Sequence, residues 1–262
     1  MKIGIVSDIH EDVNSLKKAF KVLHKEKCSH LVCLGDFTGY CVPYYGFLRS
    51  RNAHKVISLL RKTNAVTLVG NHDLFSIRKL PVHKAGFPYP KSWYSLDYRT
   101  RKKQSKGKIF LYENNELSAL LTKDDKKFIR QLPEYIVKKY GDLKLLFSHY
   151  AFPDVTGSTT REPKKPKDVQ KHFSFMKKQG CTIGISGHDH KEGMLVFSEK
   201  TVRKIPFNKT IRLTNNLTWL HGPSVANGSF ANGVLVLDTD KEEILAIPLK
   251  SKKHVPPAWR KL

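Results

Sequence analysis

Five short apolar runs in this chain each end directly in side chains that bind metal ions, and this repeated ending limits the possible folds more than any other feature. The runs cover residues 3–7, 31–34, 65–69, 143–148 and 182–186. Their length predicts buried strands. The side chains that follow the runs are, in chain order, Asp8 and His10, Asp36, Asn71 and His72, His149, and His188 and His190. Because open α/β folds place ligands at the carboxyl ends of their strands, we expect these side chains to meet in one cleft.

Carboxylate, imidazole and amide groups together form a donor set that suits divalent cations. Each ending alone is weak, since Asp-x-His is common after strands and the segment from Gly70 to Asp73 could be a turn that Gly and Asn favour. His188 and His190 could not face one ion from a helix, but after Gly187, where the backbone can turn, they can point into the same cleft. Turn preference alone does not readily produce five such endings in one chain. We therefore predict a site for two divalent cations.

The ordered motifs resemble those of the calcineurin-like metallophosphoesterase superfamily. In this sequence they read Asp8-x-His10, Gly35-Asp36, Gly70-Asn71-His72-Asp73, His149 and Gly187-His188-x-His190. The run 35–40 is similar to the Gly-Asp-x-x-Gly-Tyr of the small bacterial and archaeal phosphodiesterase-like branch, and the segment 221–225 matches that branch more loosely. The resemblance implies an α/β (α+β) fold, a four-layer αββα sandwich in which helices flank two mixed β-sheets. The order of strands and helices along the chain fits this architecture.

The resemblance also implies a role for each of these side chains. The residues it assigns to the first cation are Asp8, His10, Asp36 and His190. The residues it assigns to the second cation are Asp36, Asn71, His149 and His188, so that Asp36 bridges the two. It further implies that a metal-bridging hydroxide attacks phosphorus and that His72 protonates the leaving alkoxide. Manganese is the first expectation for the metal, and iron, zinc, cobalt and nickel are alternatives because all accept this mixed nitrogen and oxygen set.

The chain departs from part of this family beside His72. Relatives that act on phosphoproteins carry an acid three residues after the motif aspartate, where it orients this histidine, whereas Gly39 stands there in this chain. Asp73 is an alternative partner for His72, although adjacency in sequence does not guarantee the geometry. The Asp-Arg-Gly run of phosphoserine and phosphothreonine phosphatases is also missing after Gly35-Asp36. Both departures argue against a protein phosphatase.

Composition permits a single domain over residues 1–262. The chain is 40% hydrophobic and has 262 residues, which is enough for one large α/β core. No apolar run approaches the roughly 18 residues of a membrane span, and the first residues enter a strand with no room for a signal peptide. We therefore expect a cytoplasmic protein with no membrane partner. The four cysteines form no Cys-x-x-Cys pair, which favours reduced thiols.

Lysine and arginine strongly outnumber the acidic residues, 47 against 23, which gives a formal net charge of +24. Such a charge attracts polyanions, but the excess is spread widely and a solvated basic surface explains it equally well. A basic and aromatic insertion at about 74–118 could form a substrate-facing cap or could simply pack on its own aromatics. Arg161, in a loop over 150–166, is a weak candidate for binding substrate phosphate. From about residue 251 we expect an irregular tail.

Two local signals predict where helices begin. Asn14 or Ser15 is the expected N-cap of the helix that follows the first strand. The sequence from Thr122 to Asp125 resembles a capping box, with Asp in place of Glu, and opens a helix that Pro133 closes.

Three functions remain open from the sequence. The first is a binuclear-metal phosphodiesterase or phosphatase, a hydrolase that acts on a small or nucleotide-like phosphoester. The second is a nuclease or RNA-end-processing phosphodiesterase with the same chemistry, which would need a continuous basic track leading to His72 and a steep salt dependence of binding. The third is a non-enzymatic scaffold of the same fold, which the full set of seven ligand residues makes a poor fit.

Overall fold

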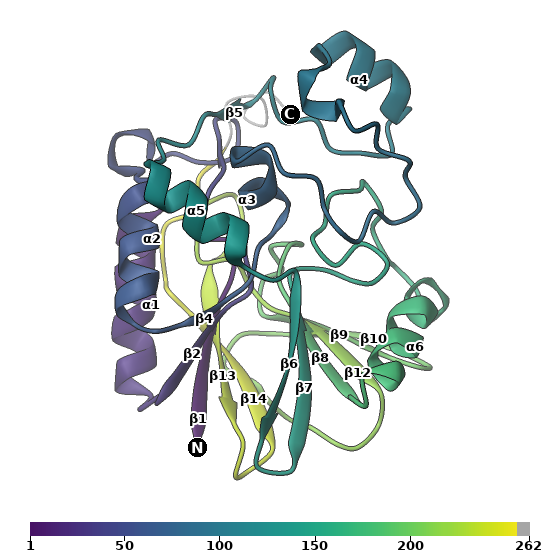
Figure 1. The fold of residues 1–262 in the computed structure, drawn as a ribbon. Helices are drawn as coiled ribbons and strands as arrows, with labels where there is room; N and C mark the ends of the chain where they lie inside the picture. The colour runs from purple at the N-terminus through teal and green to yellow at the C-terminus, as the bar shows by residue number, and fades with distance from the viewer. Residues whose placement is uncertain (256–262) are drawn as a thin grey trace.

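Two six-stranded β-sheets face each other at the centre of the molecule, and helices lie outside them (Figure 1). This architecture comes from a computed structural model that describes residues 1–255. The strand order is β11-β14-β13-β1-β2-β4 in the first sheet and β10-β9-β12-β8-β7-β6 in the second, and β3 and β5 form a small separate ribbon.

The elements have the following bounds. The first sheet contains β1 (Lys2–Val6), β2 (His30–Cys33), β4 (Val66–Thr67), β11 (Thr210–Arg212), β13 (Gly233–Asp238) and β14 (Glu243–Pro248). The second contains β6 (Tyr135–Tyr140), β7 (Leu143–Ser148), β8 (Ile183–Ser186), β9 (Met194–Ser198), β10 (Val202–Ile205) and β12 (Thr218–His221). The ribbon contains β3 (Tyr40–Cys41) and β5 (Glu116–Leu117). The helices are α1 (Val13–Lys25), α2 (Ala53–Lys62), α3 (Asn71–Ser76), α4 (Tyr98–Ser105), α5 (Lys123–Gln131) and α6 (Gln170–Lys178).

Three apolar clusters hold the layers together. The first fills the space between the two sheets and includes Ile5 from β1 and Phe147 from β7. The second joins the outer face of the first sheet to α1, α2 and α5, and the third joins the outer face of the second sheet to α6. The helices in these two outer layers, α1, α2, α5 and α6, each pack an apolar stripe against a sheet, as the helical spacing of their apolar residues requires. The predicted four-layer αββα fold is therefore confirmed.

Parallel strands at the centre of each sheet decide where the site lies. In the first sheet β1 pairs in parallel with β2, and β2 with β4. In the second sheet β8 pairs in parallel with both β7 and β12. The carboxyl ends of neighbouring parallel strands fall on the same rim, so the loops after these six strands lie at one edge of each sheet.

Several local expectations need correction. Asp12, and not Asn14 or Ser15, is the N-cap of α1, because its Oδ1 accepts a hydrogen bond of 2.9 Å from the backbone N–H of Ser15. The sequence analysis also missed β6, β10 and β11. Each of these strands pairs with a single neighbour at a sheet edge, and such strands are half exposed and lack the continuous apolar run of a central strand.

The basic and aromatic insertion packs partly on itself. Tyr89, Trp93 and Ile109 form a small buried cluster within it, and α4 is its longest regular element. Among the described residues, no helix is long and apolar enough to cross a membrane. Residues 251–255 form no helix or strand, and the remainder of the predicted tail, 256–262, lies outside the described residues.

The capping box of α5 generates a stability prediction. The Thr122 hydroxyl accepts a hydrogen bond from Asp125 N (3.1 Å), and Thr122 N donates to Asp125 Oδ2 (2.9 Å). Thr122→Ala should lower the free energy of unfolding by about 1 kcal/mol, because one helix N–H loses its partner. Thr122→Ser keeps the hydroxyl and is the matched control in a denaturant titration. Equal stability of the Ala and Ser variants would contradict the role of this cap.

Candidate metal centre

All seven side chains predicted as metal ligands converge where the strands of the two sheets end. The ligand atoms of the first group, which lie within 4.8 Å of one another, belong to Asp8, His10 and His190. A second group with the same spacing belongs to Asp36, His149 and His188. The side-chain amide of Asn71 lies against the second group. These groups match the two ligand sets expected from the sequence, although their assignment as ligands stays a prediction.

Asp36 occupies the position between the two groups. Its Oδ2 lies 3.0 Å from His149 Nε2 in the second group. It also belongs to a third group of closely spaced ligand atoms with His10 and His72. Its other oxygen, Oδ1, accepts a hydrogen bond of 2.9 Å from His72 N. A carboxylate in this position could be shared by two cations.

Backbone carbonyls orient two of the imidazoles. His10 Nδ1 lies 2.7 Å from the carbonyl oxygen of Gly39, and His149 Nδ1 lies 3.1 Å from that of Leu34. In the neutral ring, a hydrogen bond from Nδ1–H to a carbonyl leaves Nε2 unprotonated, with its lone pair toward the site. This second contact is a regular feature of histidines that bind metals, because it fixes both the tautomer and the direction of the ring.

The backbone is strained at most of these positions. Five of the seven predicted ligands are non-glycine residues with positive φ angles between 46° and 72°. They are Asp8, His10, Asp36, His188 and His190. A left-handed conformation costs an L-residue on the order of 1 kcal/mol, and such residues cluster at functional sites where the surrounding structure holds them. Turn preference alone does not explain histidines in this region.

Two polar atoms test whether cations fit here. Asp8 Oδ1 is buried and has no hydrogen-bond partner among the described residues. Asn71 donates from its amide nitrogen to Tyr112 Oη (2.8 Å), so its amide oxygen faces the second group, 3.2 Å from both Asp36 Oδ2 and His188 Nδ1. Reversing the amide would give the inward atom a proton to donate. A pair of cations would instead give a partner both to the Asn71 amide oxygen and to the unpaired Asp8 Oδ1. The donor set of this site therefore fits two cations.

The pKa values of His10 and His149 are shifted in opposite directions, and both shifts are consistent with cation binding. Burial and the neighbouring rings His72 and His190 lower the pKa of His10 to about 3, so its lone pair is available near neutral pH. Burial also opposes protonation of His149, but Asp36 and Asp8 outweigh it and raise the pKa of His149 to about 9. The two carboxylates thus favour a positive charge beside them, which bound cations would supply.

His72 stands beside the two groups with a carboxylate partner. Its Nδ1 lies 2.5 Å from Glu116 Oε2, which leaves Nε2 as the ring nitrogen available to a substrate. Burial would lower the pKa of His72, but Glu116 and Asp36 raise it to about 9, so the ring carries a proton near neutral pH. The side chain of His72 is 15% exposed whereas that of Glu116 is 2% exposed. His72 is therefore the group of this pair that a substrate can reach.

Gly39 is required by the position of this histidine ring. A Cβ at residue 39 would lie 2.6 Å from His72 Nδ1, and Gly39 also has a φ of +92°. No acidic side chain fits at position 39, and the carboxylate that contacts His72 comes from Glu116 instead. Pairing of Cys41 with Glu116 in the β3–β5 ribbon brings that carboxylate to His72.

Asp73 does not partner His72, which corrects the alternative raised from the sequence. Its carboxylate accepts hydrogen bonds from the backbone N–H groups of Asp36 (2.7 Å), Thr38 (2.9 Å) and Gly70 (3.0 Å). It therefore fixes the loop that carries Asp36.

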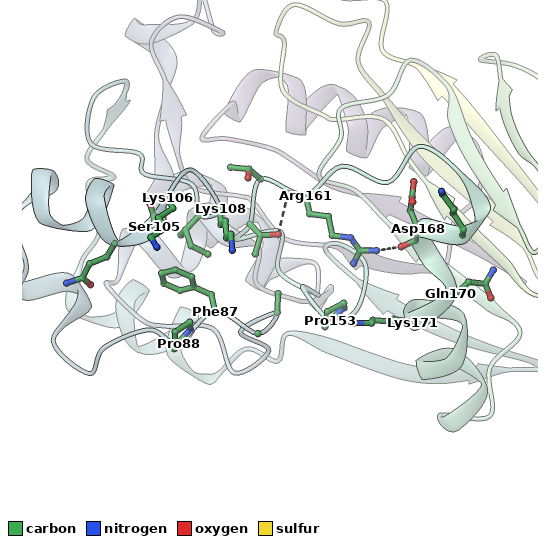
Figure 2. Close-up of a pocket in the computed structure, with 17 residues that line it drawn as sticks. Phe87, Pro88, Ser105, Lys106, Lys108, Pro153, Arg161, Asp168, Gln170 and Lys171 are labelled. Carbon is green, nitrogen blue, oxygen red and sulfur yellow. Dashed lines mark hydrogen bonds between the residues drawn. The ribbon is translucent and has the colours of Figure 1, made fainter.

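The metal groups open into a cleft of about 420 Å³. Its rim carries three of the most exposed aromatic side chains, Tyr44 (45%), Phe110 (39%) and Phe230 (47%). Arg161 also lines this cleft, but its guanidinium donates to the backbone carbonyl of Asp168, as Figure 2 shows. In this conformation Arg161 is held by the protein and not free for a phosphate.

Sequence reasoning missed Glu116 and Tyr112, which lie in the insertion and follow no strand-end motif. The only sequence feature that indicates them is their place in the basic and aromatic insertion, which could form a substrate-facing cap. Tyr112 packs 4.7 Å from the ring of His72 and holds the Asn71 amide. The insertion thus supports the site directly.

Comparison with known proteins agrees with this arrangement. The chain is 25% identical over 162 residues to an uncharacterized protein of Methanocaldococcus jannaschii, a match that covers 58% of this chain and 54% of the relative, so the match spans about half the length of that curated protein. A metallophosphoesterase from Sphaerobacter thermophilus superposes with a TM-score of 0.67 at 14% identity, covering 96% of this chain and 89% of that one. A hypothetical protein from Pyrococcus horikoshii OT3 gives 0.58 at 12% identity, covering 96% and 88%.

These structural likenesses show the same fold. The family model for calcineurin-like phosphoesterases matches residues 1–192, which hold all seven predicted ligands and His72. Members of this family use divalent metals and act on phosphoesters. The chain belongs to the calcineurin-like phosphoesterase family.

Proposed function

We propose that this chain is a binuclear-metal phosphoesterase, a hydrolase that cleaves phosphodiester or phosphomonoester bonds of a small or nucleotide-like substrate. One observation carries the proposal: Asp36 lies between two groups of ligand atoms, close to His149 and His188 on one side and to His10 on the other. His72, which has its own carboxylate partner, lies beside them. The cleft of about 420 Å³ is of the size that small ligands occupy.

The proposed metal ligands divide into two sets. Asp8, His10 and His190 hold one cation, and Asn71, His149 and His188 hold the other, with Asp36 between them. When bound, two such cations lower the pKa of a water molecule and neutralise the charge on a phosphoryl group. No serine or cysteine nucleophile is required for this chemistry. Manganese is the metal to test first, with iron, zinc, cobalt and nickel as alternatives.

His72 is the proposed general acid. The Glu116 carboxylate fixes the proton on Nδ1 and favours the doubly protonated ring, so Nε2–H is available to the oxygen of the leaving group. A positioned acid of this kind accelerates a reaction by about 10²- to 10⁴-fold. Glu116 acts through His72 and is a positioning residue.

Hydrolysis of a bis-aryl phosphodiester, compared with the corresponding monoester, tests the proposal. Metal-stripped protein should be inactive, and manganese should restore turnover of at least one of the two substrates. Two bound metals without turnover of either would instead favour the scaffold alternative.

Metal stoichiometry tests the shared carboxylate. Asp36→Asn should lose both cations, because each loses the same negative charge. Asp8→Asn is the matched control and should lose one, because Asp8 belongs to a single group. Elemental analysis of the purified variants measures both. Retention of two metals by Asp36→Asn would refute the bridging role.

Substrates with different leaving groups test whether His72 is the general acid. His72→Ala should retain both metals and should slow cleavage of an alkyl phosphodiester by about a hundredfold or more. Glu116→Gln should slow it by about 10- to 100-fold, since the ring loses its charged partner. Cleavage of a nitrophenyl ester should suffer far less in both variants, because nitrophenolate leaves without a proton. Equal losses for the two kinds of substrate would show that the proton comes from elsewhere.

A further inference from the structure

We propose that a second, lysine-lined cleft beside the metal centre binds the phosphate backbone of a single-stranded nucleic acid, whose scissile phosphate lies at the metal groups. This inference rests on the proposed phosphoesterase chemistry and extends the substrate from a small phosphoester to a polynucleotide, the nuclease alternative left open by the sequence.

The second cleft has a volume of about 850 Å³ and lies between the insertion and α6 (Figure 2). Its exposed cations come from both walls. Lys106 and Lys108 stand on the insertion side, and Lys167 and Lys171 stand at and just before α6. None of these four lysines forms a salt bridge with any residue in the described range 1–255.

The lining of the cleft contains almost no acidic side chains. Asp168 is the one acidic residue in its lining, and its Oδ2 already accepts hydrogen bonds from the backbone N–H groups of Lys164 (3.0 Å) and Lys165 (2.9 Å). Four unpaired cations around one hollow repel one another, and a polyanion relieves that repulsion. Several positive side chains spread along a groove match a chain of phosphates better than a single one.

The two clefts adjoin. Thr160 and Arg161 line both. The insertion pairs with this segment, since Phe110 N donates to Ser158 O (3.1 Å) and Thr160 N donates to Lys108 O (3.0 Å). The lysine cleft therefore lies next to the metal centre, as a basic track for a nucleic acid requires.

Lys108 and Phe110 lie on the same exposed side of that pairing. Ile109, between them, is buried, and alternate residues of an extended segment face the same way. Lys108 lines the lysine cleft and Phe110 lines the metal cleft, two residues or about 7 Å farther along. A strand that follows this edge would meet a cation and then an aromatic ring.

The aromatic rim favours nucleic acid over a bare phosphate chain. Tyr44, Phe110 and Phe230 come from three separate loops and all remain exposed around the metal groups. Exposed aromatic rings next to a basic groove stack nucleobases without sequence preference, and this combination is typical of proteins that bind single strands. An inorganic polyphosphate would make no use of these rings.

Binding to a fluorescent oligothymidylate with phosphorothioate linkages, which resist hydrolysis, tests the inference. The protein is loaded with manganese, and anisotropy is followed across a salt series. Replacing Lys106, Lys108, Lys167 and Lys171 together by Ala should weaken binding at least about tenfold at low salt. It should also reduce the slope of log affinity against log salt by about 3, because each lost phosphate contact contributes roughly 0.7.

A control of equal charge lies on the other side of the molecule. Lys17, Lys18, Lys21 and Lys25 are exposed on α1, which covers the first sheet, whereas α6 covers the second (Figure 1). Replacing these four by Ala removes the same charge and should leave the salt slope nearly unchanged. Phe110→Leu, which keeps an apolar side chain but removes the ring, should weaken binding by about fivefold or more.

Two results would overturn the inference. If the cleft and α1 variants lose affinity and salt slope equally, overall charge and not the cleft accounts for binding. If tripolyphosphate displaces the strand from the wild type as well as an oligonucleotide of equal charge does, and Phe110→Leu has no effect, the cleft binds phosphate chains alone.

Hydrolysis of the bis-aryl diester separates this inference from the proposed function. That substrate is too small to reach the lysine cleft, so the cleft variant should cleave it at the wild-type rate. A wild type that hydrolyses neither the diester nor the corresponding monoester would refute the phosphoesterase proposal by itself. Loss of strand binding with intact diester cleavage would support the cleft assignment.

Discussion

Two buried carboxylates impose the constraint on which the rest of the structure depends. Asp8 and Asp36 are 0% and 1% exposed where the ends of the two sheets meet. Burial of an unpaired carboxylate costs several kcal/mol, so the fold must surround both groups with donors or positive charge. Histidines from three further strand ends lie around them, and one oxygen of Asp8 still lacks a hydrogen-bond partner among the described residues. The negative charge of these carboxylates is not fully compensated by the protein, and this is the physical reason that the rim suits cations.

The geometry around these carboxylates is held by loops that are tied to one another. The Asp73 carboxylate fixes the loop after β2, and backbone bonds join the loop after β1 to it, since Ile9 N and His10 N both donate to Asp36 O. This network is strong enough to keep several ligand residues in left-handed conformations. A rigid surround of this kind preorganises a metal site and limits how far its ligands can move when ions bind.

The insertion links the site to the outer surface of the molecule. Its end pairs with β3 and brings Glu116 to His72, and its middle pairs with the loop after β7 and forms one wall of the lysine cleft. One segment therefore helps to orient the proposed acid and also shapes the approach to it. A change in this segment would affect the proposed chemistry and substrate binding together, whereas the loops at the strand ends supply only the proposed metal ligands.

The sequence by itself determined the central strands and the group of side chains that meet at the rim, because a buried strand followed at once by ligand residues is a local pattern. The four-layer fold followed from the resemblance of the ordered motifs to a known family, with which the order of strands and helices agrees. It also predicted the α5 capping box, whose partners are three residues apart. Only the tertiary structure decided the partner of His72. Glu116 is 44 residues away in sequence and is brought to the ring by the β3–β5 ribbon. No local periodicity in the sequence predicts that pairing. The position of the lysine cleft beside the metal centre was decided in the same way, because it depends on pairing of the insertion with a loop about 50 residues farther along the chain.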